Sequence, residues 1–472
     1  MPTTHPTNGT FDIAIIGAGV VGCALARAFA MDGARVVVLE KAHDILDGAS
    51  KGNSAILHAG FDAPEGALEA ELIAAGHAEY LKIHDRLNLP LLKSGALVIA
   101  WTEEEQAALP ALMDQARANG VGDVEPLDES ELRALEPGLG PQARAAFRVP
   151  REYLIDPWAA PLAYLTQAVR HGASVLRNCE VTSGQFTGTS WDLETSHGPV
   201  QANGVINAAG LYGDKVDQML LGRSDFSIKP RKGQFVVYDK PAFDLASHIL
   251  LPVPTKVTKG IVVCRTIWGN LLVGPTAEEQ DSRNDASLDP SMLDALKKRG
   301  EDILPALKDH NITALYAGLR PATEEKHYRI NKHSEHMITV GGIRSTGLSA
   351  ALGIAQHVRA LWDTQWRVPK PVWPCVPNIA ETAPRDWQNP GHGGIVCHCE
   401  MVTQREILAA LNGPLPARSL AGLKRRTRVT MGRCQGYYCA GALAELTKGR
   451  LTQPMTQAED PNRSPLLMTH DD

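Results

Sequence analysis

The stretch Phe11-Asp-Ile-Ala-Ile-Ile-Gly17-Ala-Gly19-Val-Val-Gly22 decides the fold. Its first half, Phe11–Ile16, is a run of apolar and β-branched residues that predicts a buried strand. The residues after the glycines predict a helix to Met31, and Arg35–Leu39 predicts a second strand that ends at Glu40. A strand, a helix and a second strand make a βαβ unit, so we expect an α/β fold with a parallel sheet.

The three glycines of this stretch predict a dinucleotide site. Gly17 permits a tight turn, Gly19 lets the backbone approach a pyrophosphate, and Gly22 lets the helix pack closely on the strand. The diphosphate would rest on the helix N-terminus, where free N–H groups favour negative charge. Glu40 is placed to accept hydrogen bonds from an adenosine ribose. The pattern does not separate FAD from NAD, and a glycine-rich turn without a ligand is the alternative.

Two later segments favour FAD. Asn207-Ala-Ala-Gly210 follows a predicted strand and offers a turn of small residues, Ala209 and Gly210, to the dinucleotide. The segment from Gly341 to Ser349 lies between a strand and a helix, whose N-terminus can stabilise negative charge on a reduced flavin. Its predicted cofactor contacts are Gly342, Ser345, Thr346, Gly347 and Leu348. A second G-x-G-x-x-G motif does not occur, which argues against a separate NAD(P)H site.

Length, charge and hydropathy exclude several classes of protein. At ~150 residues per domain, 472 residues correspond to about three structural units. A net charge of −6 provides no overall attraction to nucleic acid. No apolar run approaches the ~20 residues that span a bilayer, and the polar start lacks a signal-peptide core. We therefore expect a cytoplasmic protein without a transmembrane segment.

The remaining elements alternate less regularly along the chain. Helices are predicted at 103–119, 129–135 and 158–171, and strands at 175–176, 204–207, 233–238, 270–274 and 337–340. Between residues 366 and 394, six prolines forbid a regular helix or a central strand. Three tryptophans in the same stretch predict a semi-rigid linker that packs along a surface.

Four of the eight cysteines crowd into one C-terminal unit, as Cys397-His-Cys399 and Cys434-Gln-Gly-Tyr-Tyr-Cys439. Two close pairs of thiolates are what a [2Fe–2S] centre requires. Zinc is an alternative, although structural zinc sites usually leave two residues between paired ligands. A redox disulfide between Cys434 and Cys439 is another. The predicted cluster domain covers 395–450, with short helices opened by Thr403 and by Ser419 and a third after Cys439, and a tail follows at 451–472.

Several motifs, taken in order, resemble the D-amino-acid-oxidase-type FAD enzymes. They are Gly17–Gly22, Lys51–Gly60, Asn207–Gly210, Gly318-Leu-Arg320-Pro321 and the Gly341 loop. Within that group the chain is similar to the large subunit of anaerobic glycerol-3-phosphate dehydrogenase and to the L-2-hydroxyglutarate oxidases. The cysteine unit resembles the bacterioferritin-associated ferredoxin domain. The resemblance implies two cofactors, FAD and a [2Fe–2S] cluster.

The resemblance also implies an interleaved body over residues 11–365. Its Rossmann-type FAD domain would comprise about 11–86, 154–225 and 322–365, and its α+β substrate domain about 87–153 and 226–321. A linker at 366–394 would join it to the small helical [2Fe–2S] domain. Companion subunits, and with them a peripheral location at the inner membrane, are implied as well.

Oxidation of a C–H bond by a flavin needs a base, and usually a cation that anchors an anionic substrate. Arg320 is the expected anchor, because a guanidinium fork matches carboxylate or phosphate and the family's arginine at this motif has that role. His58 is the expected base, with a structural histidine as the alternative. Lys51, Asn53 and Ser54 are expected to contact FAD. Candidates for holding a second anionic group are Lys232, Arg265 and Arg344, each of which is otherwise a surface charge.

One departure from the resemblance bears on the substrate. Where the hydroxyglutarate oxidases have a tyrosine and then a lysine, this chain has Phe61-Asp62 and then Glu69. The lost cation disfavours a dicarboxylate, so we expect a dehydrogenase for the secondary alcohol of a polyol phosphate or a small hydroxy acid. Electrons would pass through the cluster to a quinone or a partner protein. The alternatives are an amino-acid, imino-acid or opine dehydrogenase, a zinc-bearing interaction module and a non-catalytic electron-transfer subunit.

Overall fold

The computed structural model describes residues 9–254 and 260–455 of the chain, which divides into two units at residues 1–385 and 386–472. Each unit has its own hydrophobic core. The predicted tail lies outside the described residues from position 456 onward. The expected boundaries between FAD and substrate parts stay predictions.

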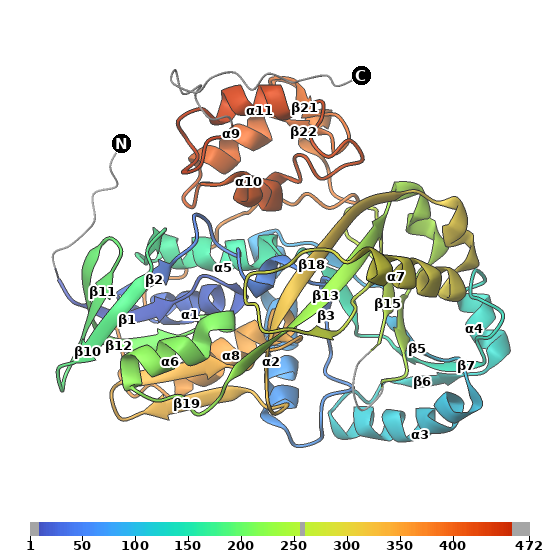
Figure 1. The fold of residues 1–472 in the computed structure, drawn as a ribbon, viewed down its shortest axis with the longest axis horizontal. Coiled ribbons are helices and arrows are strands. Elements are labelled where there is room, and N and C mark those ends of the chain that lie inside the picture. Colours follow the sequence, from blue (N-terminus) through green and yellow to red (C-terminus); the bar gives the residue numbers. More distant parts are fainter. Residues whose placement is uncertain (1–8, 255–259, 456–472) are drawn as a thin grey trace, which may run out of the picture. The chain divides into compact units, whose positions relative to one another are not determined.

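The first unit contains a mixed sheet whose central strands run parallel, as the glycine stretch predicts (Figure 1). Strand β1 pairs in parallel with β2 and with β12, and β12 pairs in parallel with β20. Ile13, Ile15, Val37 and Leu39 are fully buried in it, as expected of a parallel sheet covered on both faces. Its eight strands are β10 (Val181–Phe186), β11 (Trp191–Thr195), β12 (Gly198–Asn207), β1 (Phe11–Ile16), β2 (Val36–Glu40), β9 (Ser174–Arg177), β20 (Met337–Gly341) and β19 (Arg329–His333). The predicted α/β fold is confirmed.

A second, mainly antiparallel sheet of nine strands belongs to the same unit. Long strands β13 and β18 pair along their whole length, with Gly233 opposite Gly318 and Arg231 opposite Arg320. The strands are β17 (Glu278–Glu279), β13 (Ile228–Tyr238), β16 (Leu271–Gly274), β15 (Val262–Arg265), β14 (Ile249–Pro252), β5 (Ala96–Ala100), β7 (Ala145–Val149), β6 (Glu125–Leu127) and β18 (Ile312–Thr323). A small sheet of β3 (Ile56–Leu57), β8 (Tyr153–Ile155) and β4 (Leu91–Leu92) lies in this unit too.

Helices α1, α2, α5 and α8 pack against one another in the first unit (Figure 1). A Cβ on Gly76 of α2 would lie 2.1 Å from the carbonyl oxygen of Ser349, and one on Gly353 of α8 would lie 2.2 Å from that of Leu72. Only glycine therefore allows α2 and α8 to approach this closely. The helices of the unit are α1 (Val20–Met31), α2 (Leu68–Ile83), α3 (Glu103–Ala118), α4 (Glu129–Leu135), α5 (Ala159–Arg170), α6 (Gly213–Leu221), α7 (Pro290–Ile303) and α8 (Gly347–Ala360). The three helices predicted at 103–119, 129–135 and 158–171 are confirmed.

The proline-rich stretch after α8 contains no α-helix or strand up to position 394, as predicted. It packs against the first unit: Trp366 meets the Phe29 ring edge-on, with centroids 6.1 Å apart. Gln167 donates its side-chain amide to the Val372 carbonyl at 2.7 Å, and Asn88 donates to the Val376 carbonyl at 2.9 Å. The stretch is therefore fastened to a surface, as its tryptophans indicate.

The second unit is a short hairpin followed by three helices. They are β21 (Ile395–Cys397), β22 (Val402–Thr403), α9 (Gln404–Asn412), α10 (Leu420–Thr427) and α11 (Ala440–Thr447). Thr403 and Glu406 form the predicted capping box at the start of α9. Ser419 caps α10 by accepting from the Gly422 amide at 3.0 Å. The small core of the second unit includes Ile407, Leu423 and Leu443, together with two of the predicted ligands, Cys397 and Cys439.

Candidate active site

A cavity of about 570 Å³ opens at the glycine turn between β1 and α1. Two close backbone contacts shape this turn. A Cβ on Gly17, whose φ is +105°, would lie 2.6 Å from the Ala208 carbonyl oxygen, and one on Gly22 would lie 2.0 Å from that of Gly17. Side chains are excluded at both positions. Gly19 faces the cavity, whereas Gly22 does not line it and serves the packing of α1 on β1.

Most of the predicted cofactor-binding residues line this cavity, although they are far apart in the sequence. They are Gly17, Gly19, Glu40, Lys51, Asn53, Ser54, Ala209, Gly210, Gly342, Ser345, Gly347 and Leu348. Backbone and small side chains make up most of this set, which is what close approach to a dinucleotide requires. The volume also falls in the range of about 300–1,000 Å³ typical of cofactor sites. The residues present therefore fit FAD.

Glu40, at the end of β2, is held by the backbone on the cavity wall. Its two carboxylate oxygens accept from the amides of Ala18 at 2.7 Å and Ala42 at 2.8 Å. Burial raises the pKa of this carboxyl, and the two amides oppose that shift. Each oxygen has a second lone pair, so the carboxylate can still accept from a ribose hydroxyl.

Two segments of the chain touch through glycines beside the cavity. A Cβ on Gly52 would lie 2.7 Å from the Gly318 Cα, and one on Gly318 would lie 2.6 Å from the Gly52 carbonyl oxygen. Tyr316, two residues before Gly318, donates its hydroxyl to the Asn53 carbonyl at 2.7 Å. The loop that contains Lys51 and Asn53 is thereby fixed against strand β18, which carries Arg320.

Arg320 lies on the cavity wall without a carboxylate partner. Its Nη2 donates to the carbonyl oxygens of Thr276 at 2.6 Å and Lys232 at 3.3 Å. Among the described residues, no carboxylate lies within 4.0 Å of the guanidinium. Burial lowers the pKa of Arg320 to about 10, and the like charges of Arg231 and Arg344 contribute to the same shift. The carboxylate of Glu278 opposes this shift of the Arg320 pKa, but it forms no ion pair with the guanidinium. The side chain is therefore a desolvated cation without an ion-pair partner among the described residues.

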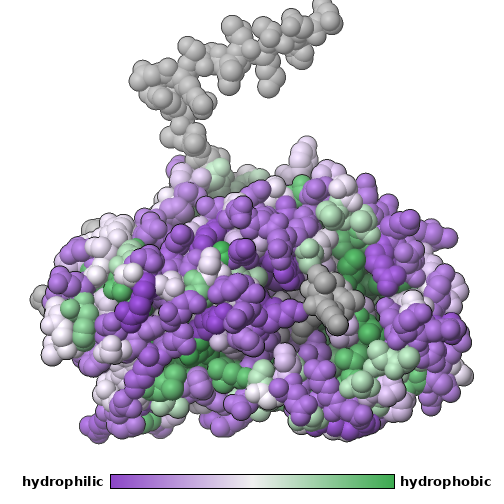
Figure 2. Space-filling view, turned by 60° about the horizontal axis from the view of Figure 1, so that its bottom comes forward, coloured by the Kyte–Doolittle hydropathy of each residue, from purple (hydrophilic) through white to green (hydrophobic). Residues whose placement is uncertain are grey.

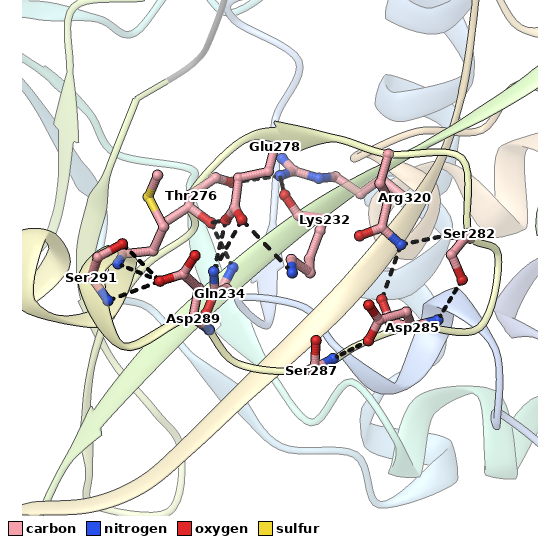
Figure 3. A network of polar contacts seen from close by, with 12 residues as sticks. Lys232, Gln234, Thr276, Glu278, Ser282, Asp285, Ser287, Asp289, Ser291 and Arg320 are labelled. Atoms are coloured by element: carbon pink, nitrogen blue, oxygen red, sulfur yellow. Dashed lines mark hydrogen bonds and ion pairs between the residues drawn. The ribbon is translucent and has the colours of Figure 1, made fainter.

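A polar network holds the segment that positions Arg320 (Figure 3). Gln234, fully buried on β13, donates its main-chain amide to Thr276 Oγ1 at 2.9 Å and its side-chain amide to Glu278 Oε1 at 2.9 Å. Its side-chain oxygen accepts from the Asp289 amide at 2.8 Å. One glutamine thus fastens both ends of the 276–289 segment, and with it the Thr276 carbonyl that orients Arg320. Sequence reasoning missed Gln234 and Thr276, because neither belongs to a recognisable motif.

The three other candidate cations differ in position. Arg344 lines the cavity, with Nη2 3.9 Å from Glu69 Oε2. Lys232 does not line it and pairs with Glu278, Nζ to Oε2 3.8 Å (Figure 3). Arg265 does not line it either and donates to the Phe243 carbonyl at 2.9 Å. Only Arg344 is therefore placed to assist Arg320.

Thr346, which belongs to the loop before α8, and its partner Glu69 do not line the cavity. Thr346 is 2% exposed and donates its hydroxyl to Glu69 Oε1 at 2.7 Å, while its oxygen also meets the Tyr328 hydroxyl at 2.5 Å. Thr346 therefore does not line the cavity with the other predicted cofactor contacts, because Glu69 and Tyr328 hold its hydroxyl, and its contact with FAD stays a prediction. Glu69 acts on the cavity only through its weak pairing with Arg344.

His58 follows strand β3 and lies behind the cavity wall formed by the other predicted residues. Its main-chain amide donates to Ser349 Oγ at 2.8 Å, next to Leu348, which does line the cavity. Its ring Nδ1 lies 2.8 Å from Glu152 Oε2. Glu152 was not predicted, since nothing in the local sequence marks a glutamate 94 positions away as a partner of His58.

The four predicted cluster ligands of the second unit are free thiols that lie in two hydrogen-bonded pairs, Cys397 with Cys439 and Cys399 with Cys434. Backbone amides, foremost that of Tyr438, lower the pKa of Cys434. Burial and the neighbouring Cys397 raise the pKa of Cys439 to about 11. As they stand, the described residues contain no group of three His, Cys, Asp or Glu side chains that could hold a metal ion. The donor set, four thiols with amides directed at sulfur, is chemically suited to an iron–sulfur cluster.

The basic run at the end of α10 is largely buried. Arg425, Arg426 and Arg428 are each buried to more than nine-tenths. Arg428 Nε donates to the buried carboxylate of Glu400 at 2.7 Å. Three of the arginines beside the cysteines therefore belong to the core of this unit.

Comparison with known proteins identifies both units. The family model "FAD dependent oxidoreductase" matches residues 12–361, and the model "BFD-like [2Fe-2S] binding domain" matches residues 395–448. The chain belongs to the FAD dependent oxidoreductase family. Its cofactors are FAD and, in the C-terminal domain, a [2Fe–2S] cluster, in place of the NAD, zinc and disulfide alternatives.

This oxidoreductase has several relatives of known name. It is 31% identical over 476 residues to a glycerol 3-phosphate dehydrogenase of Caloramator mitchellensis, with 97% of this chain and 98% of the relative covered. It is 26% identical to one subunit of the anaerobic glycerol-3-phosphate dehydrogenase of Escherichia coli, with 92% and 87% covered. A solved structure of L-α-glycerophosphate oxidase from Mycoplasma pneumoniae with FAD bound superposes with a TM-score of 0.71 at 28% identity, covering 77% of this chain and 97% of that one.

The described part of this oxidoreductase contains no helix that is both long and apolar enough to cross a membrane. Figure 2 shows a face that is mostly hydrophilic, with hydrophobic residues gathered in patches.

Proposed function

We propose that this oxidoreductase is a dehydrogenase that oxidises the secondary alcohol of a small phosphorylated polyol, with glycerol 3-phosphate as the first candidate. The observation that carries the proposal is the unpaired, desolvated guanidinium of Arg320 on the cavity wall. Nη1 of this guanidinium donates to no described residue, so its two N–H groups are left to bind phosphate oxygens. The names of the relatives support the same substrate class.

The charges around the cavity favour one strongly anionic group over two separate ones. Of the three other candidate cations, Arg344 is the one that lines the cavity, and it shares its charge with Glu69 at 3.9 Å. A dicarboxylate needs a full cation at each end, whereas a phosphate places its whole charge at one end. A phosphate ester therefore fits better than 2-hydroxyglutarate, and a small hydroxy acid with one carboxylate stays the nearest competitor.

The proposed reaction removes a hydride and a proton from the alcohol. Arg320 holds the anionic end, and His58 accepts the hydroxyl proton. Bound FAD supplies a hydride acceptor, and the [2Fe–2S] cluster supplies a carrier for single electrons. Lys51, Asn53, Ser54 and the Gly342–Leu348 loop hold the cofactor in the cavity.

The final electron acceptor is proposed to be a quinone or a partner protein. The E. coli relative is by name part of a larger enzyme, which supports companion subunits for this chain and a peripheral place at the inner membrane through them. Outside that complex the protein would remain in the cytoplasm.

The test is an anaerobic titration of the FAD-loaded protein. Glycerol 3-phosphate should bleach the flavin absorption, and electron paramagnetic resonance should then detect the reduced cluster. Lactate, 2-hydroxyglutarate, proline and glycine are tested separately as alternative substrates at the same concentrations. Bleaching by an amino or imino acid in place of glycerol 3-phosphate would replace the proposal, and a flavin that none of them bleaches would indicate an electron-transfer role without catalysis.

A further inference from the structure

Glu152 is a fully buried carboxylate with an unusually small set of partners. It lies between β7 and β8 and is 0% exposed. Its Oε1 accepts from the Ala59 amide at 2.6 Å, and its Oε2 lies 2.8 Å from His58 Nδ1. Among the described residues, no lysine or arginine lies within 4.0 Å of it. Burying a carboxylate in this way is costly unless it is hydrogen-bonded, so the Ala59 amide and the ring of His58 are the groups that stabilise it.

The same contact fixes how the His58 ring uses its two nitrogens. A carboxylate can only accept, so Nδ1 must carry a proton toward Glu152. The neutral ring then has a bare Nε2. This atom has no hydrogen-bond partner among the described residues and is not among the buried unpartnered atoms, so it can accept a hydrogen bond from a molecule that reaches it. His77 does not compete for Glu152, because its ring bonds the Arg151 carbonyl at 2.9 Å.

We propose that Glu152 is the positioning residue of the reaction: it fixes His58 as a base at Nε2 and compensates the charge that the ring gains. The inference rests on the proposed function. In the step it supports, the alcohol loses its hydroxyl proton to Nε2 and its carbinol hydride to bound FAD, leaving a ketone. The imidazolium so formed is stabilised by the carboxylate of Glu152, which accepts from Nδ1. A general base held in this way is worth roughly 10²- to 10⁴-fold in rate.

The chain offers a matched control for this pair. Glu136 is also buried and accepts from the His248 amide and from His248 Nδ1, both at 2.7 Å. Neither residue lines the cavity. The Glu136–His248 pair therefore has the same chemistry and burial, but none of its bonds reaches the cavity wall, whereas His58 bonds Ser349, which is next to Leu348 of that wall.

The first experiment measures flavin reduction by glycerol 3-phosphate, anaerobically, in the FAD-loaded full-length protein. In Glu152→Gln the amide oxygen satisfies Ala59 and the NH₂ group faces Nδ1, which moves the ring proton onto Nε2. Reduction should slow by about 10²-fold or more, while FAD content is retained. Glu136→Gln should reduce its flavin at the wild-type rate. Equal slowing in both variants would mean that Glu152 has only a structural role.

A double variant tests whether Glu152 acts through His58. If it does, His58→Asn slows reduction by a similar factor, and adding Glu152→Gln to it changes the rate by less than about threefold. Multiplied effects in the double variant would overturn the inference. Both comparisons require that the wild-type flavin is bleached; if it is not, the proposed function fails, and if it is bleached and Glu152→Gln is equally fast, only this inference fails.

A readout without turnover covers the case in which Glu152→Gln folds poorly. In wild-type protein labelled with ¹⁵N-histidine, the signals of His58 are those absent from His58→Asn. Nitrogen chemical shifts separate a bare ring nitrogen from one that carries a proton. The expected result is a bare Nε2 and a protonated Nδ1, and a protonated Nε2 in the wild type would contradict the inference.

Discussion

The flavin cavity and the cysteine unit are built in opposite ways. The cavity gathers residues from Gly17 to Leu348, and its main charged group, Arg320, has no carboxylate partner within the described structure. The cysteine unit draws its four candidate ligands from Cys397 to Cys439, and Arg428 beside them is paired with Glu400 and buried. In the cavity, which is made of distant segments, a charged side chain is left without an ion-pair partner and can bind a substrate. In the cysteine unit, which is local, the charged side chains are paired with each other around a resident group.

The largest effect is expected in the local site. Cys434→Ser removes one thiolate ligand, so the iron content should fall to roughly a tenth or less of the wild-type value. FAD and its bleaching by substrate should be retained, because the cavity takes nothing from this unit. Iron analysis and the flavin spectrum of the same sample provide the measurement. Loss of flavin together with iron would break the comparison.

A smaller but still large effect is expected at the open charge. Arg320→Ala should weaken substrate binding by about 2–3 kcal/mol, which corresponds to roughly 30- to 150-fold in KM. FAD should stay bound. Arg320→Lys keeps the charge but loses the forked guanidinium, so its KM should lie between those of the wild type and Arg320→Ala. The measurement is the KM of the three proteins. A wild-type KM in Arg320→Ala would show that Arg320 does not anchor the substrate.

The contact between distant segments can be tested at its glycines. Gly52 has an ordinary φ of −114°, yet an added Cβ would lie 2.7 Å from the Gly318 backbone. Gly52→Ala should therefore cost about 1–3 kcal/mol and weaken FAD binding roughly tenfold. The control is Gly48→Ala, on the same cavity wall, where no atom lies within 4 Å of the new methyl group. Equal FAD affinity in both variants would show that the crossing has no influence on the cofactor.

The smallest effect concerns pH. The pKa of Arg320 is about 10, so the guanidinium is protonated at neutral pH and begins to lose its charge only near that value. KM should therefore be insensitive to this group below about pH 9 and rise as pH passes about 10. A bound anion stabilises the protonated form of Arg320. The pKa of Arg320 should therefore be higher in the substrate complex than in the free enzyme. An increase of KM already between about pH 7 and 8 would point to another group.

The sequence predicted the parts whose geometry is local. The βαβ unit, the glycine turn and the capping box at Thr403 depend on residues near one another, and the structure has them. The cysteines that are close in sequence are not the ones that pair, because the structure joins Cys397 to Cys439 and Cys399 to Cys434. The sequence did not predict Glu152 or Gln234, since their partners are brought to them by the pairing of strands distant in sequence. Thr346 does not line the cavity, because Glu69 and Tyr328 hold its hydroxyl, and no spacing rule reports that contact.

The crossing of α2 and α8 at Gly76 and Gly353 has a mechanical consequence. With backbone against backbone there is no layer of side chains on which one helix can slide or tilt past the other. We therefore expect the loop ahead of α8 and the start of α2 to move together as one rigid unit. A movement that opens the site to a substrate or a product should occur at another position in the molecule.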